Sequence, residues 1–240
     1  MFEIKKELFR LECKKKPSFD LIENAEVVSD ISANPAGDWY ALAAGVRTVA
    51  DRFDKITIVE VGTAHGASIR NMYNFMQVYA PDKKVEYCAV DSKLHNYEPY
   101  FISNVSSINF INGMSTDPDI ISQVPNQIHF LFVDACHCKE HVYQDLKNYT
   151  PKLVQNGCVA LHDCLPQFQG GTEQPSTPQC DPDDTHIGVL KGIDRFEMKK
   201  RGYNLIFEDF PTDKNYGGTR IYSKDTDYSI NKPKKRKGSE

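Results

Sequence analysis

The run from Ile56 to Ser68 constrains the fold of this chain more than any other stretch. It opens with β-branched and apolar residues that predict a buried parallel strand, and this strand stops at Gly62. After Gly66, apolar residues recur at helical spacing, at Ile69, Met72, Tyr73, Met76 and Tyr79. Strand, glycine loop and helix in this order are typical of a nucleotide site, because glycine lets a ligand approach the backbone N–H groups at the helix start.

The spacing of the two glycines excludes two common nucleotide motifs. Gly62-x-x-x-Gly66 is neither the G-x-G-x-x-G of a dinucleotide fingerprint nor the G-x-x-x-x-G-K of a P-loop. A dehydrogenase is therefore disfavoured. By itself the loop could equally be an ordinary strand-to-helix turn, so its interpretation depends on the residues around it.

From Lys55 onward, predicted strands and helices alternate, which indicates an α/β fold with a doubly wound, mostly parallel sheet of seven strands. The expected strands are 55–62, 84–91, 107–112, 128–136, 158–162, 203–210 and 219–223, and the expected helices are 67–80, 95–105, 118–124, 139–155 and 188–201. Gly157 is expected to mark the end of the helix before the fifth strand. The turn PTDKNYGG predicts that the last two strands form an antiparallel hairpin.

The domain organisation follows from this pattern. Residues 1–54 predict an N-terminal helical cap, in which Asp38 caps a helix. Residues 55–224 form the predicted α/β domain, and residues 225–240 a basic, disordered tail. Within the domain, residues 165–186 are too long for a plain connection and predict a lid or substrate loop, with an insertion of no function as the alternative.

Charge is distributed unevenly along the chain. The 29 basic and 33 acidic residues give a net charge of −4, but five of the basic residues and only one acidic residue lie in 232–240. The remainder therefore holds 24 basic against 32 acidic residues, a net −8 that matches nucleic-acid phosphates poorly. The PKKRK tail could be a nuclear-localisation signal, or simply a solvated terminus.

Cellular location is indicated by three features. The first residues lack the apolar core of a secretion signal, and no apolar run is long enough to cross a membrane. The seven cysteines are an odd number spread through predicted strands, which is typical of reduced thiols. A cytoplasmic protein is therefore expected, with a nuclear location open through the tail.

Polar residues follow the predicted strands at their carboxyl ends, which is where doubly wound sheets bind ligands. They are Glu60 to Ser68, Asp91, Gly113 to Asp117, Asp134 to His137, His162 and Asp163. Asp91 follows the strand after the glycine loop. Its carboxylate could accept both hydroxyls of a ribose, or it could simply cap a helix.

The segments VEVGTAHG, AVD, INGMS, LFVDACH and VALHDC, followed by a hairpin, resemble class I S-adenosylmethionine-dependent methyltransferases. The similarity covers roughly residues 55–224 and is greatest from Phe130 to Asp163. Within that class the chain is most similar to small-molecule O-methyltransferases of the macrocin and catechol types. The resemblance implies a Rossmann-like methyltransferase fold and transfer of the methyl of S-adenosylmethionine to a hydroxyl of a sugar or phenol.

The resemblance also implies which residues contact the cofactor. Asp91 would hold the ribose, and Gly113, Met114 and Ser115 would line the adenine. Asp134 and His137 would lie near the cofactor too. The methionine part would be surrounded by Glu60, Gly62, Thr63, Ala64, His65, Gly66 and Ser68.

A catalytic centre of Asp134, His162 and Asp163 is implied by the same resemblance, because related enzymes bind a divalent ion there, commonly magnesium. Magnesium prefers oxygen ligands, so His162 does not match this pattern. Two alternatives stay open. Either Asp134 and Asp163 bind the ion while His162 acts as general base, which we favour, or His162 deprotonates the acceptor without a metal.

A zinc site is a rival interpretation for Cys136, His137, Cys138 and His141, which crowd together in the sequence. However, the pair Cys136-x-Cys138 lacks the usual gap of about two to four residues. Buried thiols beside one active-site histidine are therefore the preferred interpretation.

Other functions remain as alternatives. A methyltransferase acting on RNA or protein is supported only by the basic tail, and no Asn-Pro-Pro-Tyr type of motif follows the fourth strand. A cofactor-binding scaffold without activity is the non-enzymatic alternative. The expected partner is a small-molecule acceptor. No membrane is expected, and nucleic acid is expected only through the basic tail. A homodimer is possible by analogy with relatives that pair through N-terminal helices.

Overall fold

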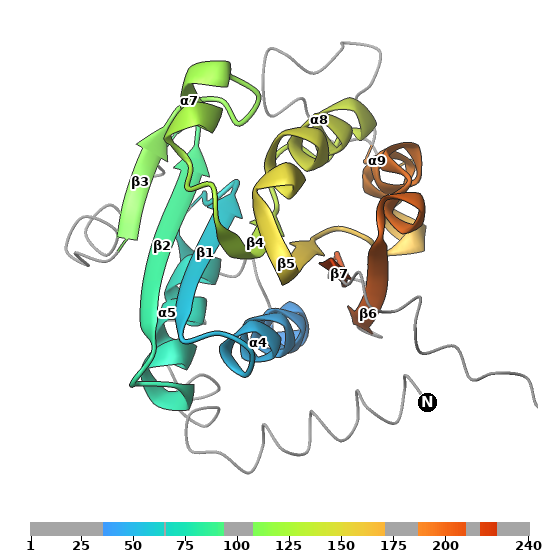
Figure 1. Ribbon diagram of the computed structural model, residues 1–240. Helices are drawn as coiled ribbons and strands as arrows, with labels where there is room; N and C mark the ends of the chain where they lie inside the picture. Colours follow the sequence, from blue (N-terminus) through green and yellow to red (C-terminus); the bar gives the residue numbers. More distant parts are fainter. Residues whose placement is uncertain (1–35, 65, 94–107, 171–186, 210–216, 225–240) are drawn as a thin grey trace, which may run out of the picture.

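A computed structural model of the chain describes residues 36–64, 66–93, 108–170, 187–209 and 217–224 (Figure 1). The strands are β1 (Lys55–Val61), β2 (Lys84–Asp91), β3 (Ile108–Asn112), β4 (Ile128–Val133), β5 (Leu153–Leu161), β6 (Tyr203–Asp209) and β7 (Thr219–Lys224). The α-helices are α4 (Ala36–Ala50), α5 (Ala67–Tyr79), α7 (Pro118–Gln123), α8 (Lys139–Tyr149) and α9 (Val189–Phe196).

The strands form one seven-stranded sheet in the order β3-β2-β1-β4-β5-β7-β6. Strands β1 to β5 pair in parallel, and β7 runs antiparallel to both β5 and β6. The predicted mostly parallel sheet with a terminal antiparallel hairpin is thus confirmed. Since β1 pairs with β2 on one side and β4 on the other, the strand order reverses there, and such a reversal creates a crevice at the strand ends.

Two apolar layers sandwich the sheet because alternate strand residues face opposite sides. Ile56 and Ile58 of β1 belong to the layer that packs against α4 and α5. Val59 and Val61 belong to the layer that packs against α8 and α9. Figure 1 shows these helix pairs on opposite faces of the sheet.

Strand β4 lies at the centre of the sheet, and all six of its residues are buried. The apolar run predicted a strand through residue 136, but the strand ends at Val133. The N–H of Asp134 makes one more bond, to the carbonyl of Val61 at 2.8 Å, and the chain then leaves the sheet. The following residues are therefore free to turn toward the crevice.

The predicted helix 139–155 is shorter than expected. It ends at Tyr149, and a 3₁₀ turn from Thr150 to Lys152 leads directly into β5. Pro151 explains the difference, because it has no N–H to donate and its ring clashes with the preceding helical turn. Gly157 therefore does not end the helix as predicted but lies within β5, where a Cβ would come within 3.1 Å of the His129 carbonyl.

Two further predicted helices have different bounds. The helix expected over 188–201 ends at Phe196, because Glu197 adopts the left-handed conformation with φ 58°, and a separate 3₁₀ turn follows. Helix α4 begins at Ala36, so Asp38 lies inside the helix and is not its cap.

Several predicted segments lie outside the described residues. They are 1–35, the helix at 95–105, most of the 165–186 loop and the tail 225–240. The domain boundaries expected from the sequence stay predictions.

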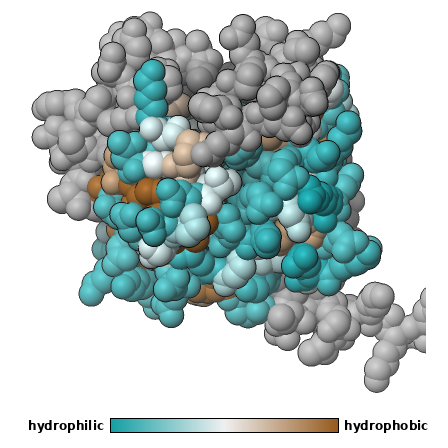
Figure 2. All heavy atoms as spheres, turned by 90° about the horizontal axis from the view of Figure 1, so that it is seen from above, coloured by the Kyte–Doolittle hydropathy of each residue, from teal (hydrophilic) through white to brown (hydrophobic). Residues whose placement is uncertain are grey.

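The described surface is mainly hydrophilic in the view of Figure 2, with small apolar patches between polar side chains. Among the described residues, Leu205 is the large apolar side chain that stands out as exposed, at 42%. No helix in the described part of the chain combines the length and the apolar character that crossing a bilayer requires.

Candidate functional site

A cleft of about 460 Å³ opens where β1, β2, β3 and β4 end. This volume lies in the range of small-molecule sites. The cleft is lined by Gly62, Ala64, Val90, Asp91, Ser92, Lys93, Gly113, Met114, Ser115, Asp134, Ala135, Cys136 and His141. Predicted cofactor residues from four separate strand ends thus share one cavity.

Gly62 allows the ends of β1 and β4 to come together. Its φ of 87° is in the left-handed region, and a Cβ there would lie 2.2 Å from the carbonyl oxygen of Asp134. It would also lie 2.4 Å from the Cα of Ala135. Any larger residue would push the two loops apart and change the shape of the cleft between them.

Asp91 ties the glycine loop to the end of β2. Its Oδ2 accepts hydrogen bonds from the N–H groups of Thr63 at 2.9 Å and Ala64 at 2.7 Å. Its Oδ1 accepts a third, from the N–H of Lys93 at 2.9 Å. Asp91 therefore fixes the loop as well as lining the cleft, a structural role that the sequence did not indicate.

Glu60 lies beneath the loop and does not face the cleft. It is only 1% exposed, and its carboxylate accepts a hydrogen bond from the Thr63 hydroxyl. Burial raises the pKa of Glu60 to about 8. Thr63, Gly66 and Ser68 are buried as well and are not among the residues that line the cleft, while His65 lies outside the described residues.

Asp134, His137, His162 and Asp163 form a second feature, which we call the acid–histidine cluster. One ligand atom of each lies within 4.8 Å of all the others. Asp134 Oδ1 lies 3.0 Å from His162 Nδ1 and 3.2 Å from His137 Nε2. Asp163 Oδ2 lies 3.1 Å from His137 Nδ1. The fold thus joins the ends of β4 and β5 in one polar centre.

Electrostatics hold both carboxylates of this cluster in the ionised form. Burial raises the pKa of Asp134, but the neighbouring His162 and His137 outweigh burial and leave that pKa well below its usual range. Burial also raises the pKa of Asp163, but the hydrogen bond and the charge of His162 lower it further, so that this pKa too lies below its usual value. Two carboxylates and two imidazoles can hold a proton or a divalent ion between them.

Asp163 is held in an unusual backbone conformation, with φ 52°. Its side chain packs against Gly217, where an added Cβ would lie 1.7 Å from Asp163 Oδ1. The carbonyl of Gly217 accepts a hydrogen bond from Leu165 N–H at 2.7 Å, and Gln169 Nε2 donates to the Asp163 carbonyl at 2.9 Å. Gly217 was not predicted as a site residue, although its position in the glycine pair before β7 is a visible signal.

The predicted catalytic residues Asp134, His162 and Asp163 therefore lie together. His137, predicted as a cofactor contact, lies in the same cluster and not among the residues that line the cleft. Asp134 belongs to both the cleft and the cluster. The two features thus meet at one side chain.

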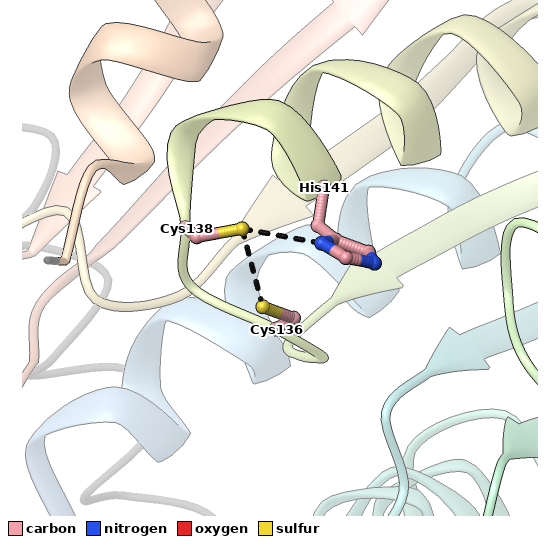
Figure 3. A group of neighbouring side chains, drawn as sticks. All are labelled: Cys136, Cys138 and His141. Atoms are coloured by element: carbon pink, nitrogen blue, oxygen red, sulfur yellow. Dashed lines mark hydrogen bonds between the residues drawn. The ribbon is translucent and has the colours of Figure 1, made fainter. Parts of the chain in front are cut away.

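Cys136, Cys138 and His141 form a third feature, which we call the cysteine–histidine cluster (Figure 3). The Sγ atoms of Cys136 and Cys138 are 3.4 Å apart, and Cys138 Sγ lies 3.1 Å from His141 Nδ1. These hydrogen bonds, the one to Cys136 first, lower the pKa of Cys138 to about 4. Both Cys136 and His141 also line the cleft; Cys136 lies within the strand-end range Asp134 to His137, but His141 was not predicted there.

Comparison with known protein families gives one match over this region. Residues 59–164 match the family model described as a methyltransferase domain. The matched residues run from within β1 to just beyond β5 and include both clusters. No curated protein sequence matches the chain.

Solved structures share the fold over most of the chain. A putative caffeoyl-CoA O-methyltransferase from Staphylococcus aureus is 14% identical with a TM-score of 0.59, over 92% of this chain and 99% of that one. CalS11, a TDP-rhamnose 3'-O-methyltransferase of calicheamicin biosynthesis, is 14% identical with a TM-score of 0.55, over 91% and 92%. The O-methyltransferase NovP is 13% identical with a TM-score of 0.55, over 79% and 80%.

At these identities the solved structures show a shared fold, and the family match independently assigns the region that contains the cleft. The strand order, the terminal hairpin and the cleft at the ends of β1 to β4 agree with that assignment. Residues 59–164 therefore match a methyltransferase domain, and the fold around them is one that solved O-methyltransferases share.

Proposed function

We propose that this chain transfers the methyl group of S-adenosylmethionine to a hydroxyl oxygen of a small molecule such as a sugar or a phenol. The position of Asp134 is the observation that supports the proposal most directly. It lines the cleft and also belongs to the acid–histidine cluster. A cofactor in the cleft and an acceptor at the cluster would therefore meet at this residue.

The cleft offers groups that suit each part of the cofactor. Asp91 presents a carboxylate to the ribose, and Met114 presents a soft apolar side chain to the adenine. The sulfonium would then lie toward Asp134, which also lines the cleft. Methyl transfer is an in-line displacement, so the main task of the protein is to align the acceptor oxygen, the methyl carbon and the sulfur.

Removal of the acceptor proton is assigned to His162. Its Nδ1 faces the carboxylate of Asp134, 3.0 Å from Oδ1, so Nε2 is the ring nitrogen that we assign to proton uptake. The ionised Asp134 and Asp163 stabilise the imidazolium that forms when the proton arrives. The proposal of an oxygen acceptor is also supported by the O-methyltransferases that share this fold, one of which is named as a TDP-rhamnose 3'-O-methyltransferase.

The donor atoms of the acid–histidine cluster suit a divalent ion. Two carboxylates and two imidazoles fit an ion of borderline softness, such as manganese, at least as well as magnesium. Asp134 and Asp163 would hold the ion, and a bound ion would lower the pKa of the acceptor hydroxyl. His162 would still take the proton.

Calorimetric titration with S-adenosylhomocysteine tests the cofactor site. Asp91→Asn is the sharpest variant, because its amide oxygen can still accept the N–H groups of Thr63 and Ala64 while the charge that serves the ribose and the acceptor for Lys93 N–H are lost. We expect the wild type to bind and Asp91→Asn to bind about tenfold or more weakly. Asp82→Asn, an exposed acid on the turn before β2, is the matched control and should bind like the wild type.

Turnover is then measured as S-adenosylhomocysteine release with a panel of hydroxylated sugars and phenols, with and without magnesium or manganese. Turnover of a hydroxylated acceptor supports the proposal, and stimulation by the ion supports the metal. Turnover of RNA or protein alone would instead favour a macromolecular substrate. Cofactor binding without any turnover would favour a scaffold, and no binding at all would contradict the proposal.

A further inference from the structure

The cysteine–histidine cluster has the dimensions of a metal site. Cys136 Sγ, Cys138 Sγ and His141 Nδ1 all lie within 4.8 Å of one another, and all three residues are buried. In a tetrahedral zinc site, Zn–S is about 2.3 Å and Zn–N about 2.0 Å, which places the ligand atoms about 3.5 to 3.8 Å apart. The observed 3.4 and 3.1 Å therefore need only small side-chain movements to admit an ion.

We propose that Cys136, Cys138 and His141 bind one zinc ion, separate from the acid–histidine cluster. Two thiolates and an imidazole are soft to borderline donors, which zinc prefers and magnesium or calcium do not. The acid–histidine cluster offers carboxylates and imidazoles instead. Of these two neighbouring sites, only the cysteine–histidine cluster therefore has the thiolates that select zinc most strongly.

The local backbone explains how an unusual spacing produces this geometry. Cys136 lies in the loop after β4, Cys138 is the residue that precedes α8, and His141 is on the first turn of that helix (Figure 3). His137, which lies between the two cysteines, is directed to the acid–histidine cluster. The three ligands therefore converge from a loop and a helix start, without the longer gap of a Cys-x-x-Cys motif.

Asp145 provides an independent observation beside the cluster. It lies one helical turn after His141 on α8 and is fully buried. Neither of its carboxylate oxygens has good hydrogen-bond geometry to a described residue, although Ser115 lies near enough to lower the pKa of Asp145 in part against the effect of burial. A buried carboxylate without a partner is costly. It lies close enough to His141 and Cys138 to interact electrostatically with both.

Zinc binding would give Asp145 a role. Histidines that bind a metal commonly donate their other ring N–H to a carboxylate, which fixes the ring. His141 directs Nδ1 to Cys138, so Nε2 would carry that N–H, and residues four apart on a helix lie on the same face. We therefore assign Asp145 as a positioning residue for His141.

Three protein ligands leave a fourth position of the zinc tetrahedron. Cys136 and His141 line the cleft, so water can reach this position from the cleft. The zinc ion would then form part of the cleft wall.

The test is the metal content and metal affinity of the full chain, purified under reducing conditions and without added cofactor. We expect one zinc per chain by mass spectrometry of the elements, and thiolate-to-cobalt charge-transfer absorption after exchange of zinc for cobalt. Cys138→Ser and His141→Ala should each weaken zinc binding by about 100-fold or more, and Asp145→Asn by about tenfold with the cobalt spectrum retained.

Two controls separate this site from other thiols and from the neighbouring cluster. Cys88→Ala removes a buried thiol outside the cluster, and Asp134→Asn removes a carboxylate of the acid–histidine cluster; both should keep wild-type zinc affinity. Circular dichroism shows whether each variant is folded. If Cys138→Ser does not fold, the zinc affinity of His141→Ala takes its place in the test.

The proposal is overturned if the folded wild type binds zinc no more tightly than the folded His141→Ala variant. It is equally overturned if the native protein holds a Cys136–Cys138 disulfide and no metal, as thiol counting would show. Neither readout requires methyl transfer, so failure of this proposal and failure of the proposed function are distinguishable.

Discussion

The acid–histidine cluster and the cysteine–histidine cluster arise from the same short segment after β4, yet they differ in how the fold builds them. The first takes Asp134 and His137 from this segment but needs His162 and Asp163 from the end of β5. The second takes all of its members from the segment and the first turn of α8. One cluster therefore depends on the sheet bringing distant residues together, while the other is a local structure.

This difference teaches how one loop can serve two kinds of chemistry. Asp134 contacts His137, and Cys136 contacts Cys138, so neighbouring residues divide between the clusters. A change in the sheet should damage the acid–histidine cluster more than the cysteine–histidine cluster. Substitutions in each region can test this expectation.

The largest effect is expected for His162→Ala, which removes the proposed general base. Loss of such a base costs about 10² to 10⁴ in kcat. Zinc affinity should stay at the wild-type value, because His162 is not a member of the cysteine–histidine cluster. Single-turnover kinetics with an accepted hydroxyl substrate, beside a zinc titration, would measure both. A parallel loss of zinc affinity would contradict the separation of the clusters.

Gly217→Ala should break the long-range cluster alone. The added Cβ would lie 1.7 Å from Asp163 Oδ1, so Asp163 has to move, at a cost of about 2 kcal/mol in the free energy of unfolding. Transfer activity should fall and zinc affinity should not. Gly202→Ala is the matched control: its φ of 84° is strained for alanine, but nothing lies within 4 Å, so it should lose some stability and keep its activity.

Glu60→Gln tests whether the buried Glu60, beneath the glycine loop, is protonated in the folded chain. Burial raises the pKa of Glu60 from 4.5 to about 8, with Asp134 and Asp91 acting in the same direction. Because the pKa of Glu60 is higher in the folded than in the unfolded chain, the contribution of Glu60 to the free energy of unfolding is fully present below pH 4.5. It is lost as the pH rises toward 8, since the unfolded chain then releases the proton first. The wild type should therefore lose roughly 3 to 4 kcal/mol of unfolding free energy over this range relative to the variant.

Urea denaturation at several pH values between 5 and 8 would measure this difference. The glutamine can still accept the hydrogen bond from Thr63, so the variant should fold. Equal pH dependence in the two proteins would show that Glu60 is ionised in the folded state.

The smallest effect is expected on the outer side of α8. Arg195 of α9 lies 4.1 Å from the centre of the Tyr143 ring and pairs with Glu140, but it is 45% exposed. Arg195→Ala should lower the unfolding free energy by only about 0.5 to 1 kcal/mol, measured by thermal denaturation. Both clusters should function normally. A large loss of zinc affinity would show that the local cluster depends on the packing of α9.

The sequence was sufficient for the fold because its signals are local and repeated. Alternating strands and helices predicted the sheet, and the glycine turn before β7 predicted the hairpin. The early end of α8 was also readable, since Pro151 cannot continue a helix. The ends of α9 were harder to predict, because they depend on the left-handed conformation of Glu197.

The site was predictable only in part. Strand-end positions placed Asp134, His162 and Asp163 at one edge of the sheet, the resemblance singled them out, and the structure brings them together. The burial of Glu60 could not be predicted, because it depends on how the loop closes over it. The contact of Gly217 with Asp163 and the division of residues 134–141 between two clusters depend on side-chain directions that spacing does not determine.

The hydrogen bonds of Asp91 have a consequence for how quickly and how tightly a ligand can be received. One carboxylate oxygen holds two N–H groups of the glycine loop before any ligand arrives. A loop that is already ordered has little conformational entropy to lose on binding. The cleft should therefore favour rapid, rigid-body association, and its selectivity should reflect shape more than the closing of the loop.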